Sequence, residues 1–287
     1  MTEPAAPAFI LTLSCPDRIG IVARVSGFFV DHGCNILESA QYGDAINGRF
    51  FYRTVFAPSR AETVSSLAEA FAPVAHAFGM EAHFYDRAAK APAILMVSRF
   101  GHCLNDLLYR CQYGGLPVDV RAIVSNHEDF RPLANTAGIA FEYLPVNAAN
   151  KLAQEEKLSA LVAQQNVELI VLARYMQVLS PAFCAAMPGR VINIHHSFLP
   201  SFKGARPYHS AHERGVKLIG ATAHYVTADL DEGPIIEQEV ERVHHGMSVA
   251  DYIAVGRDVE AVTLARAVKW HAERRVLLNG KRTIVFS

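Results

Sequence analysis

Two polar side chains lie two residues apart at the end of an apolar segment, where they are suited to act on a carbonyl group. The segment is Val-Ile-Asn-Ile-His at residues 191–195, and its β-branched character predicts a strand. Because side chains alternate across a strand, Asn193 and His195 point to the same side. An amide N–H can stabilise a developing oxyanion, and an imidazole can move a proton near neutral pH. The pattern indicates attack on a carbonyl carbon.

An acidic loop further along the chain supplies a candidate partner for the imidazole. Residues 219–226 predict a strand that carries His224, and the loop Thr-Ala-Asp-Leu-Asp-Glu-Gly-Pro follows it at 227–234. If this loop folds back over the end of the first strand, Asp231 can polarise His195 or position a water molecule. Taken alone, an aspartate in such a loop more often serves turn chemistry.

Short apolar segments alternate with helical ones around these residues and predict an open, mostly parallel α/β sheet. Such nearly continuous apolar runs are typical of strands buried on both faces. The expected strands are residues 93–98, 118–125, 169–173, 191–195, 219–226 and 234–243, with helices near 103–112 and 151–165. Open α/β sheets bind ligands at the carboxyl ends of their strands, which is where Asn193 and His195 fall.

A long helix is expected after Ser248, with Asp251 as its capping-box partner. We expect this helix to serve packing and not function. Its expected buried stripe consists of Val249, Ile253, Val259, Val262 and Ala265.

The first ninety residues predict a separate βαββαβ unit. Its expected strands are 9–14, 35–41, 49–56 and 80–85, and its second helix is 63–78. We expect Asp17 to cap the first helix. The stripe buried by that helix is expected to be Ile19, Val22, Val25 and Phe29.

Domain boundaries follow from composition. Residues 87–92 are polar and end in proline, so we expect a linker there between a domain at 1–86 and a domain at 93–287.

Composition excludes several classes of protein. The 287 residues include 27 basic and 28 acidic side chains, a balance that argues against binding nucleic acid. No apolar run approaches the roughly 18 residues of a membrane span, and the N-terminus does not resemble a signal peptide. Five cysteines form no C-x-x-C pair, which suits reduced thiols. We therefore expect a cytoplasmic enzyme.

Several cofactor and metal motifs are missing. Neither a dinucleotide-binding glycine pattern nor a Walker A sequence is present. His209 and His212 are spaced to share a helix face, but they lack the H-E-x-x-H order of a zinc enzyme. We expect neither a metal ion nor a separate cofactor.

Residues 92–287 resemble the folate-dependent formyltransferase family. The resemblance lies in Asn193-x-His195, then Ser197-x-Leu199-Pro200, then Asp231-x-Gly233-Pro234, in that order. It implies that Asn193, His195 and Asp231 form the catalytic triad. Residues 172–180 resemble the family's folate-binding strand end and loop, which contact the pterin largely through backbone groups. The substrate-binding residues implied in this way are Arg174, Tyr175, Met176, Gln177, Val178, Leu179, His224 and Gly233.

The N-terminal segment resembles an ACT domain, a regulatory βαββαβ module that commonly binds amino acids. The resemblance lies in Cys-Pro-Asp-Arg-Ile-Gly at 15–20 and Gly-x-Asn-Ile at 33–36. It implies that Asp17, Gly20 and Asn35 contact an effector such as glycine or methionine at the interface of a homo-oligomer. Alternatively, these residues serve turns and the domain only joins subunits.

The two domains together resemble the formyltetrahydrofolate deformylase family, which hydrolyses 10-formyltetrahydrofolate to formate and tetrahydrofolate. Formate released in this way can feed purine biosynthesis, and the reaction balances one-carbon folate pools. The implied mechanism has water activated by His195 and Asp231, and an oxyanion stabilised by Asn193 and His195. Phe-Gly-His-Cys-Leu-Asn at 100–105 stands where a ribonucleotide transformylase has a glycine- and serine-rich phosphate loop.

Two other classes stay open, namely a transferase with an unphosphorylated amine acceptor and a non-enzymatic folate or amino-acid sensor. Lys203, Arg206 and His209 either line the space that a transferase leaves for its acceptor or are capping and surface residues.

Overall fold

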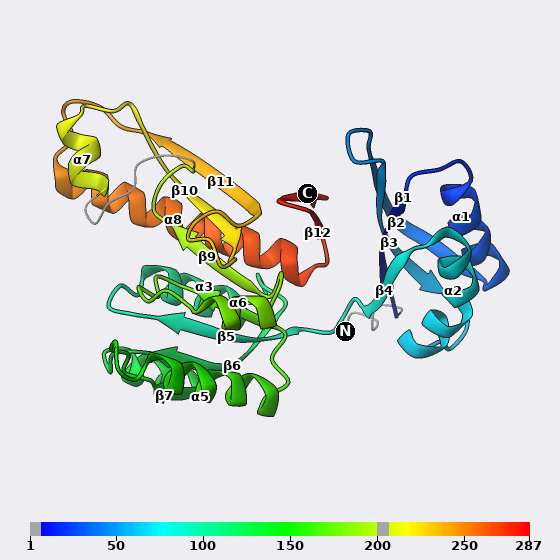
Figure 1. The fold of residues 1–287 in the computed structure, drawn as a ribbon, viewed down its shortest axis with the longest axis horizontal. Helices are drawn as coiled ribbons and strands as arrows, with labels where there is room; N and C mark the ends of the chain where they lie inside the picture. The colour runs from blue at the N-terminus through cyan, green and yellow to red at the C-terminus, as the bar shows by residue number, and fades with distance from the viewer. Residues whose placement is uncertain (1–6, 200–206) are drawn as a thin grey trace. The chain divides into compact units, whose positions relative to one another are not determined.

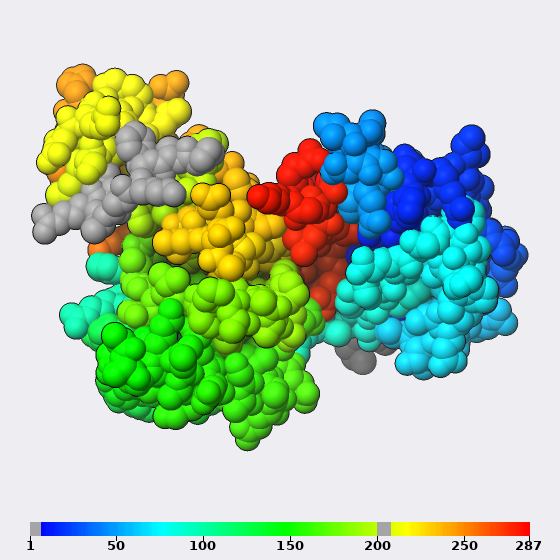
Figure 2. Space-filling model, in the orientation of Figure 1, coloured from blue at the N-terminus to red at the C-terminus, as the bar shows by residue number. Residues whose placement is uncertain are grey.

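The computed structural model describes residues 7–199 and 207–287, which form two compact units (Figure 1). One unit joins the chain up to Ala89 with Glu273–Asn279 and Ile284–Ser287, and the other joins Lys90–Ala272 with Gly280–Thr283. The C-terminal segment therefore departs from the predicted continuous second domain. Arg53 of the first unit donates to the carbonyl of Glu273 at 3.0 Å, and Asn279 donates to Asp44 at 2.7 Å. Figure 2 shows the red atoms of this segment against the blue atoms of the first unit.

The first unit has the predicted βαββαβ order. Its four strands form an antiparallel sheet in the order β2-β3-β1-β4. Gly48 adopts a φ of +60° in the hairpin between β2 and β3, where Asn47-Gly48 is a pair of residues typical of tight hairpin turns. The elements are β1 (Phe9–Pro16), α1 (Ile21–Asp31), β2 (Cys34–Asp44), β3 (Arg49–Pro58), α2 (Val64–Phe78) and β4 (Glu81–Asp86).

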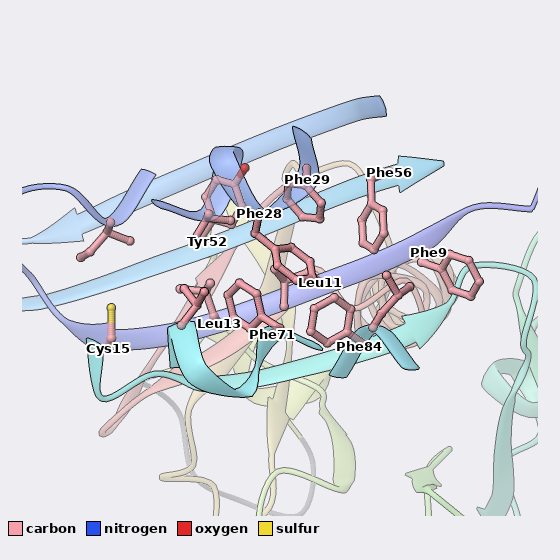
Figure 3. Packing of buried hydrophobic residues seen from close by; sticks show 14 of the residues in the cluster. Phe9, Leu11, Leu13, Cys15, Phe28, Phe29, Tyr52, Phe56, Phe71 and Phe84 are labelled. Carbon is pink, nitrogen blue, oxygen red and sulfur yellow. The ribbon is translucent and has the colours of Figure 1, made fainter. Parts of the chain in front are cut away.

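Aromatic side chains fill the core between the two helices and one face of this sheet (Figure 3). Phe28 of α1 packs edge-on against Phe71 of α2, with ring centroids 5.0 Å apart. The ring centroids of Phe29 and Phe56 of β3 lie 4.6 Å apart. Such ring pairs add to the burial of apolar area that stabilises a small unit.

The start of α1 differs from the prediction. Gly20, at a φ of +96°, is its N-cap and no side chain caps the helix, so the expected cap at Asp17 is wrong. Because the helix begins at Ile21, its phase also differs. Ile19 and Val22 are exposed, and the stripe that the helix buries is Ile21, Val25, Phe28 and Phe29.

The second unit is built on a seven-stranded sheet in the order β11-β10-β9-β8-β5-β6-β7. Strands β7, β6, β5, β8 and β9 pair in parallel, and β10 and β11 are antiparallel. This confirms the open, mostly parallel sheet. The strands are β5 (Ala91–Val97), β6 (Val118–Ser125), β7 (Ala140–Tyr143), β8 (Leu169–Leu172), β9 (Val191–His195), β10 (Leu218–Tyr225) and β11 (Ile235–Arg242).

Helices pack on this sheet and enclose its apolar strands. Leu158 of α5 and Phe183 of α6 join a core that contains Ile94 of β5 and Ile170 of β8. Helix α8 packs against α3 and along β9, β10 and β11. The helices are α3 (His102–Gln112), α4 (Arg131–Ala137), α5 (Lys151–Gln164), α6 (Pro181–Ala186), α7 (Pro207–Glu213) and α8 (Val249–Ala272).

The chain changes direction across the sheet beside β5. From β5 it runs outward through β6 and β7, and it then returns to the other side of β5 with β8 and β9. A sheet of this kind leaves a crevice at the carboxyl ends of its strands where the order reverses. His195, the last residue of β9, lies at such a strand end.

Helix α8 begins with the predicted capping box. The backbone N–H of Ser248 donates to Asp251 at 2.7 Å, and the N–H of Asp251 donates to the Ser248 hydroxyl at 3.2 Å. Its buried stripe differs in part, because Val262 is 38% exposed while Glu260 is 1% exposed. A short hairpin, β12 (Val276–Asn279) and β13 (Arg282–Val285), follows the helix.

Among the helices of the described part of the chain, none is long and apolar enough to cross a lipid bilayer.

Candidate active site

Strand pairing brings the polar side chains of β9 and β10 together. Asn193 lies opposite His224 in the register of the two strands, and His195 lies opposite Thr222. Since residues two apart share a face, Asn193 and His195 both line one cavity of about 350 Å³. His224 lines the same cavity and is 2% exposed.

Asp231 reaches His195 from the loop between β10 and β11. Its Oδ2 lies 3.2 Å from His195 Nδ1, and its Oδ1 lies 3.6 Å from His224 Nε2. The hydrogen bond from His195, and after it the imidazole of His224, holds the pKa of Asp231 well below its ordinary range. The carboxylate therefore stays charged and orients the imidazole of His195.

The backbone of this loop is shaped to present Asp231. Asp231 adopts a φ of +57°, a conformation that few residues other than glycine and asparagine or aspartate tolerate. Two residues on, a Cβ at Gly233 would lie 1.7 Å from the carbonyl oxygen of Tyr225. Gly233 therefore lets the loop close against β10. It does not line the cavity, although the resemblance implied that it contacts substrate.

His224 fixes the amide of Asn193. Its Nδ1–H donates to the carbonyl oxygen of Tyr225 at 2.9 Å, and its Nε2 faces both Asn193 and Asp231. Asn193 Nδ2 lies 3.3 Å from that Nε2. The amide nitrogen is thereby held toward His224, and its second N–H is available to a ligand in the cavity.

The loop after β8 forms the opposite wall of the cavity. All six residues that the sequence resemblance assigned to this loop line the cavity: Arg174, Tyr175, Met176, Gln177, Val178 and Leu179. Met176 and Val178 are more than half exposed, and the backbone N–H of Met176 donates to Ser98 at 2.9 Å. The hydroxyl of Ser98, which follows β5, thus ties this loop to the sheet.

Arg174, unlike the exposed Met176 and Val178, turns its side chain inward. Its backbone has a φ of +65°. Its Nη1 donates to His196 Nδ1 at 3.0 Å, and its Nε lies 3.3 Å from Glu260 Oε2. The guanidinium therefore serves this buried contact, a role that the sequence did not predict.

The carboxylate of Glu260 contacts three side chains from separate parts of the second unit. Besides Arg174, it accepts from His102 Nε2 at 2.8 Å and from the Tyr208 hydroxyl at 2.5 Å. Burial raises the pKa of Glu260, but the bond from His102 and the charge of Arg174 outweigh that effect and lower it. The expectation that α8 serves packing alone missed this carboxylate. The available signal was an acid at a position between the predicted buried residues Val259 and Val262.

Glu260 and two residues near it are of metal-binding types. His102, Cys103 and Glu260 place possible ligand atoms within 4.8 Å of one another. However, His102 and Glu260 already bond to each other, and burial raises the pKa of the Cys103 thiol well above its ordinary value. The proton on this thiol has to leave before its sulfur can bind a metal, because the thiolate is the form that binds.

The residues predicted to contact an effector lie apart within the first unit. Gly20 precedes α1, Asp17 lies beside it after β1, and Asn35 lies in β2 beyond the other end of α1. The 11 residues of α1 span about 16 Å at 1.5 Å per residue. Gly20 and Asn35 therefore lie beyond opposite ends of this helix.

Of the three residues left open by the sequence, His209 is exposed on α7. Lys203 and Arg206 lie outside the described residues.

The sequence matches two protein families. Residues 92–268 match the formyl transferase family, and residues 9–72 match the ACT domain. The chain is 50% identical over 277 residues to formyltetrahydrofolate deformylase from Corynebacterium sp. (strain P-1), covering 96% of this chain and 97% of the relative. It is 49% identical over 279 residues to formyltetrahydrofolate deformylase from Bacillus subtilis (strain 168), covering 96% and 93%.

The fold is also similar to a solved structure. The crystal structure of formyltetrahydrofolate deformylase from Burkholderia mallei superposes with a TM-score of 0.95 at 52% sequence identity. The match covers 98% of this chain and 100% of that one.

Proposed function

The chain belongs to the formyl transferase family and, within it, to the formyltetrahydrofolate deformylases, and from this premise we propose how its site works. The enzyme hydrolyses 10-formyltetrahydrofolate to formate and tetrahydrofolate. The observation that carries the mechanism is the contact of 3.2 Å between His195 Nδ1 and Asp231 Oδ2 at the cavity that Asn193 also lines.

The first step is attack by water. Asp231 accepts from His195 Nδ1–H, so His195 Nε2 carries the lone pair and takes a proton from the water as its oxygen bonds to the formyl carbon. The carbonyl oxygen becomes an oxyanion that the free N–H of Asn193 and the protonated His195 stabilise. The charge of Asp231 stabilises the imidazolium that forms beside it.

The second step releases the folate nitrogen. The bond between the formyl carbon and N10 breaks, and the imidazolium of His195 gives its proton to N10. The products are tetrahydrofolate and formic acid, which loses a proton to solvent as formate. No step requires a metal ion or a separate cofactor, because the folate itself carries the formyl group.

Folate recognition falls to the two loops that flank the triad. We assign the pterin to the space between residues 174–179 and residues 226–231, which line the same cavity. Apolar side chains such as Val178 and Leu230 suit the flat ring, and backbone groups of these loops suit its polar edge.

We also propose that the ACT domain binds an amino acid, with glycine and methionine as the candidates. Because Gly20 and Asn35 lie beyond opposite ends of α1, the site takes these residues from two copies of the chain, which requires a homo-oligomer.

We also propose where the enzyme acts and what its products serve. All five cysteines are free thiols, which suits the cytoplasm. There the reaction supplies formate for purine biosynthesis and balances the folate pools.

The assignment of Asn193 is tested by its replacement. Removing an oxyanion donor costs about 10² to 10³ in rate, so Asn193→Ala is expected to lower kcat by that factor with KM for the folate nearly unchanged. Formate release measured without any amine gives both constants. An Asn193→Ala enzyme that is folded and keeps normal turnover overturns the oxyanion role.

A further inference from the structure

We infer that His196 holds the attacking water, that Arg174 orients His196 for this task, and that the pair selects water over an amine. This inference rests on the proposed function and adds a specificity-determining residue to it. The observations that carry it concern two neighbouring imidazoles, His195 at the end of β9 and His196 directly after it.

The rings of His195 and His196 are stacked at the cavity. Their centroids lie 4.7 Å apart and their planes are inclined by 23°. Both residues line the cavity of about 350 Å³ that contains the triad. The Nε2 atoms of both rings are buried, and neither has a hydrogen-bond partner among residues 7–199 and 207–287. Buried polar atoms of this kind call for a partner, and a bound water is the usual one.

The two Nε2 atoms have opposite hydrogen-bonding roles. His195 Nδ1 faces the Asp231 carboxylate, which can only accept, so the proton is on Nδ1 and Nε2 is an acceptor. His196 Nδ1 faces Arg174 Nη1, which can only donate, so Nδ1 accepts and the proton of the neutral ring is on Nε2. Burial, and after it the charge of Arg174, lowers the pKa of His196 to about 4, so the ring is neutral at pH 7.

In the inferred arrangement, one water molecule lies between the two atoms and bonds to both. It donates a hydrogen to His195 Nε2, which is the proton that His195 removes during attack. It accepts a hydrogen bond from His196 Nε2–H through one of its lone pairs. Its second lone pair stays free for the formyl carbon.

An amine cannot adopt the same arrangement. A neutral amine nitrogen has a single lone pair, and that pair is occupied when the nitrogen accepts from His196. The donor at His196 Nε2 therefore favours water as the nucleophile and blocks an amine in the same position. This explains how a formyltransferase-type site can produce formate.

The backbone conformation of Arg174 and its contact with Glu260 fix the guanidinium beside His196. The φ of +65° at Arg174 is an uncommon conformation for a residue with a side chain, and such strain persists where the surroundings determine it. The carboxylate of Glu260, 1% exposed, lies 3.3 Å from Arg174 Nε and is itself fixed by His102 and Tyr208. Arg174 is thus a positioning residue that acts through His196.

The test compares two variants of similar size that differ in the donor. In His196→Gln the side-chain amide can supply an N–H near the position of Nε2, whereas His196→Met supplies none. We expect His196→Met to lose about 10²- to 10³-fold in kcat for formate release, as for other lost donors, with KM within threefold of wild type. His196→Gln is expected to stay within about tenfold of wild type, on the same donor argument.

A second readout follows the nucleophile itself. With glycinamide added, His196→Met is expected to give at least tenfold more formylated amine per formate than wild type or His196→Gln. Equal losses in kcat for Gln and Met, or an unchanged product ratio, overturn the inference. A wild-type enzyme that releases no formate overturns the proposed function instead, so the two failures are distinguishable.

A measurement on the wild-type chain decides the matter if the variants fail to fold. In ¹⁵N-histidine NMR spectra at pH 7, we expect His196 as the neutral Nε2–H tautomer and His195 with its proton on Nδ1. A charged His196, or a proton on its Nδ1, contradicts the inference.

Discussion

His195 Nδ1 lies 3.2 Å from Asp231 Oδ2, although the two residues belong to separate elements. His195 ends β9, and Asp231 belongs to the loop after β10, which pairs with β9 in antiparallel register. That pairing places the start of the loop beside the first residues of β9, where the N–H of Val226 donates to the carbonyl oxygen of Val191 at 2.9 Å, and the loop then brings Asp231 to His195. The contact therefore depends on the sheet, and the chemistry of His195 depends on the contact.

Replacing Asp231 by asparagine removes the charge but keeps the size of the side chain. We expect Asp231→Asn to lower kcat for formate release by about 10³ to 10⁴, because the imidazole loses the group that sets its tautomer and stabilises its charged form. Steady-state kinetics with 10-formyltetrahydrofolate measure the effect. A folded Asp231→Asn enzyme with kcat within tenfold of wild type contradicts the role of the carboxylate.

Gly233 is expected to tolerate no side chain. In Gly233→Ala the new Cβ meets the carbonyl oxygen of Tyr225 at 1.7 Å, so the loop that carries Asp231 has to move. We expect the free energy of unfolding to fall by about 1 to 3 kcal/mol, as in other overpacked sites. We also expect kcat to fall at least about tenfold, the factor that corresponds to about 1.4 kcal/mol of lost transition-state stabilisation.

A matched control for this glycine is Gly27 inside α1, where an added Cβ has no atom within 4 Å. Gly27→Ala is expected to leave kcat unchanged and to stabilise the protein by about 0.5 to 1 kcal/mol. Urea unfolding and formate release measure both variants. Equal behaviour of the two alanine variants contradicts the steric account of Gly233.

His196 is expected to make stability depend on pH in a defined window. Its pKa falls from an ordinary value of 6.5 to about 4 in the folded chain, owing to burial and then to Arg174. Between these values the unfolded chain takes up a proton and the folded chain does not, so the stabilisation is fully present above pH 6.5 and is lost as the pH falls toward 4.

The measurement is the free energy of unfolding of wild type and His196→Gln from pH 7 to pH 4. The charged and titratable groups near His196 are Arg174, His195, Glu260 and Asp231. Asp231, whose pKa is well below its ordinary 3.8, contributes below this window. We expect the variant to lose less stability than wild type across it. Parallel curves for the two proteins contradict the buried, neutral state of His196.

Strands with a buried apolar run were the easiest elements to predict. The bounds of β6 and β9 coincide with the predicted ranges, although β6 carries Asp119 and the exposed Arg121 in its first half and only its last four residues are all buried. In contrast, β7 was not predicted. Its four residues, Ala-Phe-Glu-Tyr, are mostly exposed at the sheet edge and carry no apolar run.

Residue type alone misplaced the start of α1. Asp17 has the chemistry of a cap, but the chain continues past it and the helix begins after Gly20. Glycine reaches the positive φ that this start requires, and that requirement prevails over the capping preference of the aspartate.

The site was predictable only where one element carries it. Strand alternation alone places Asn193 and His195 on one side. The assignment of Asp231 to the same site came from the family resemblance, because its contact depends on how a loop folds. The contacts among His102, Arg174, His196 and Glu260 join separate elements, and no spacing in the sequence specifies them.

The most direct test of the account is amine-free turnover with His195 replaced. Purified protein is incubated with 10-formyltetrahydrofolate, and formate and tetrahydrofolate are both quantified, with His245→Ala as the control at an exposed histidine. We predict equal amounts of the two products from wild type and from His245→Ala, and none above background from a folded His195→Ala. Formate release by His195→Ala at the wild-type rate contradicts the account, since another group then activates the water.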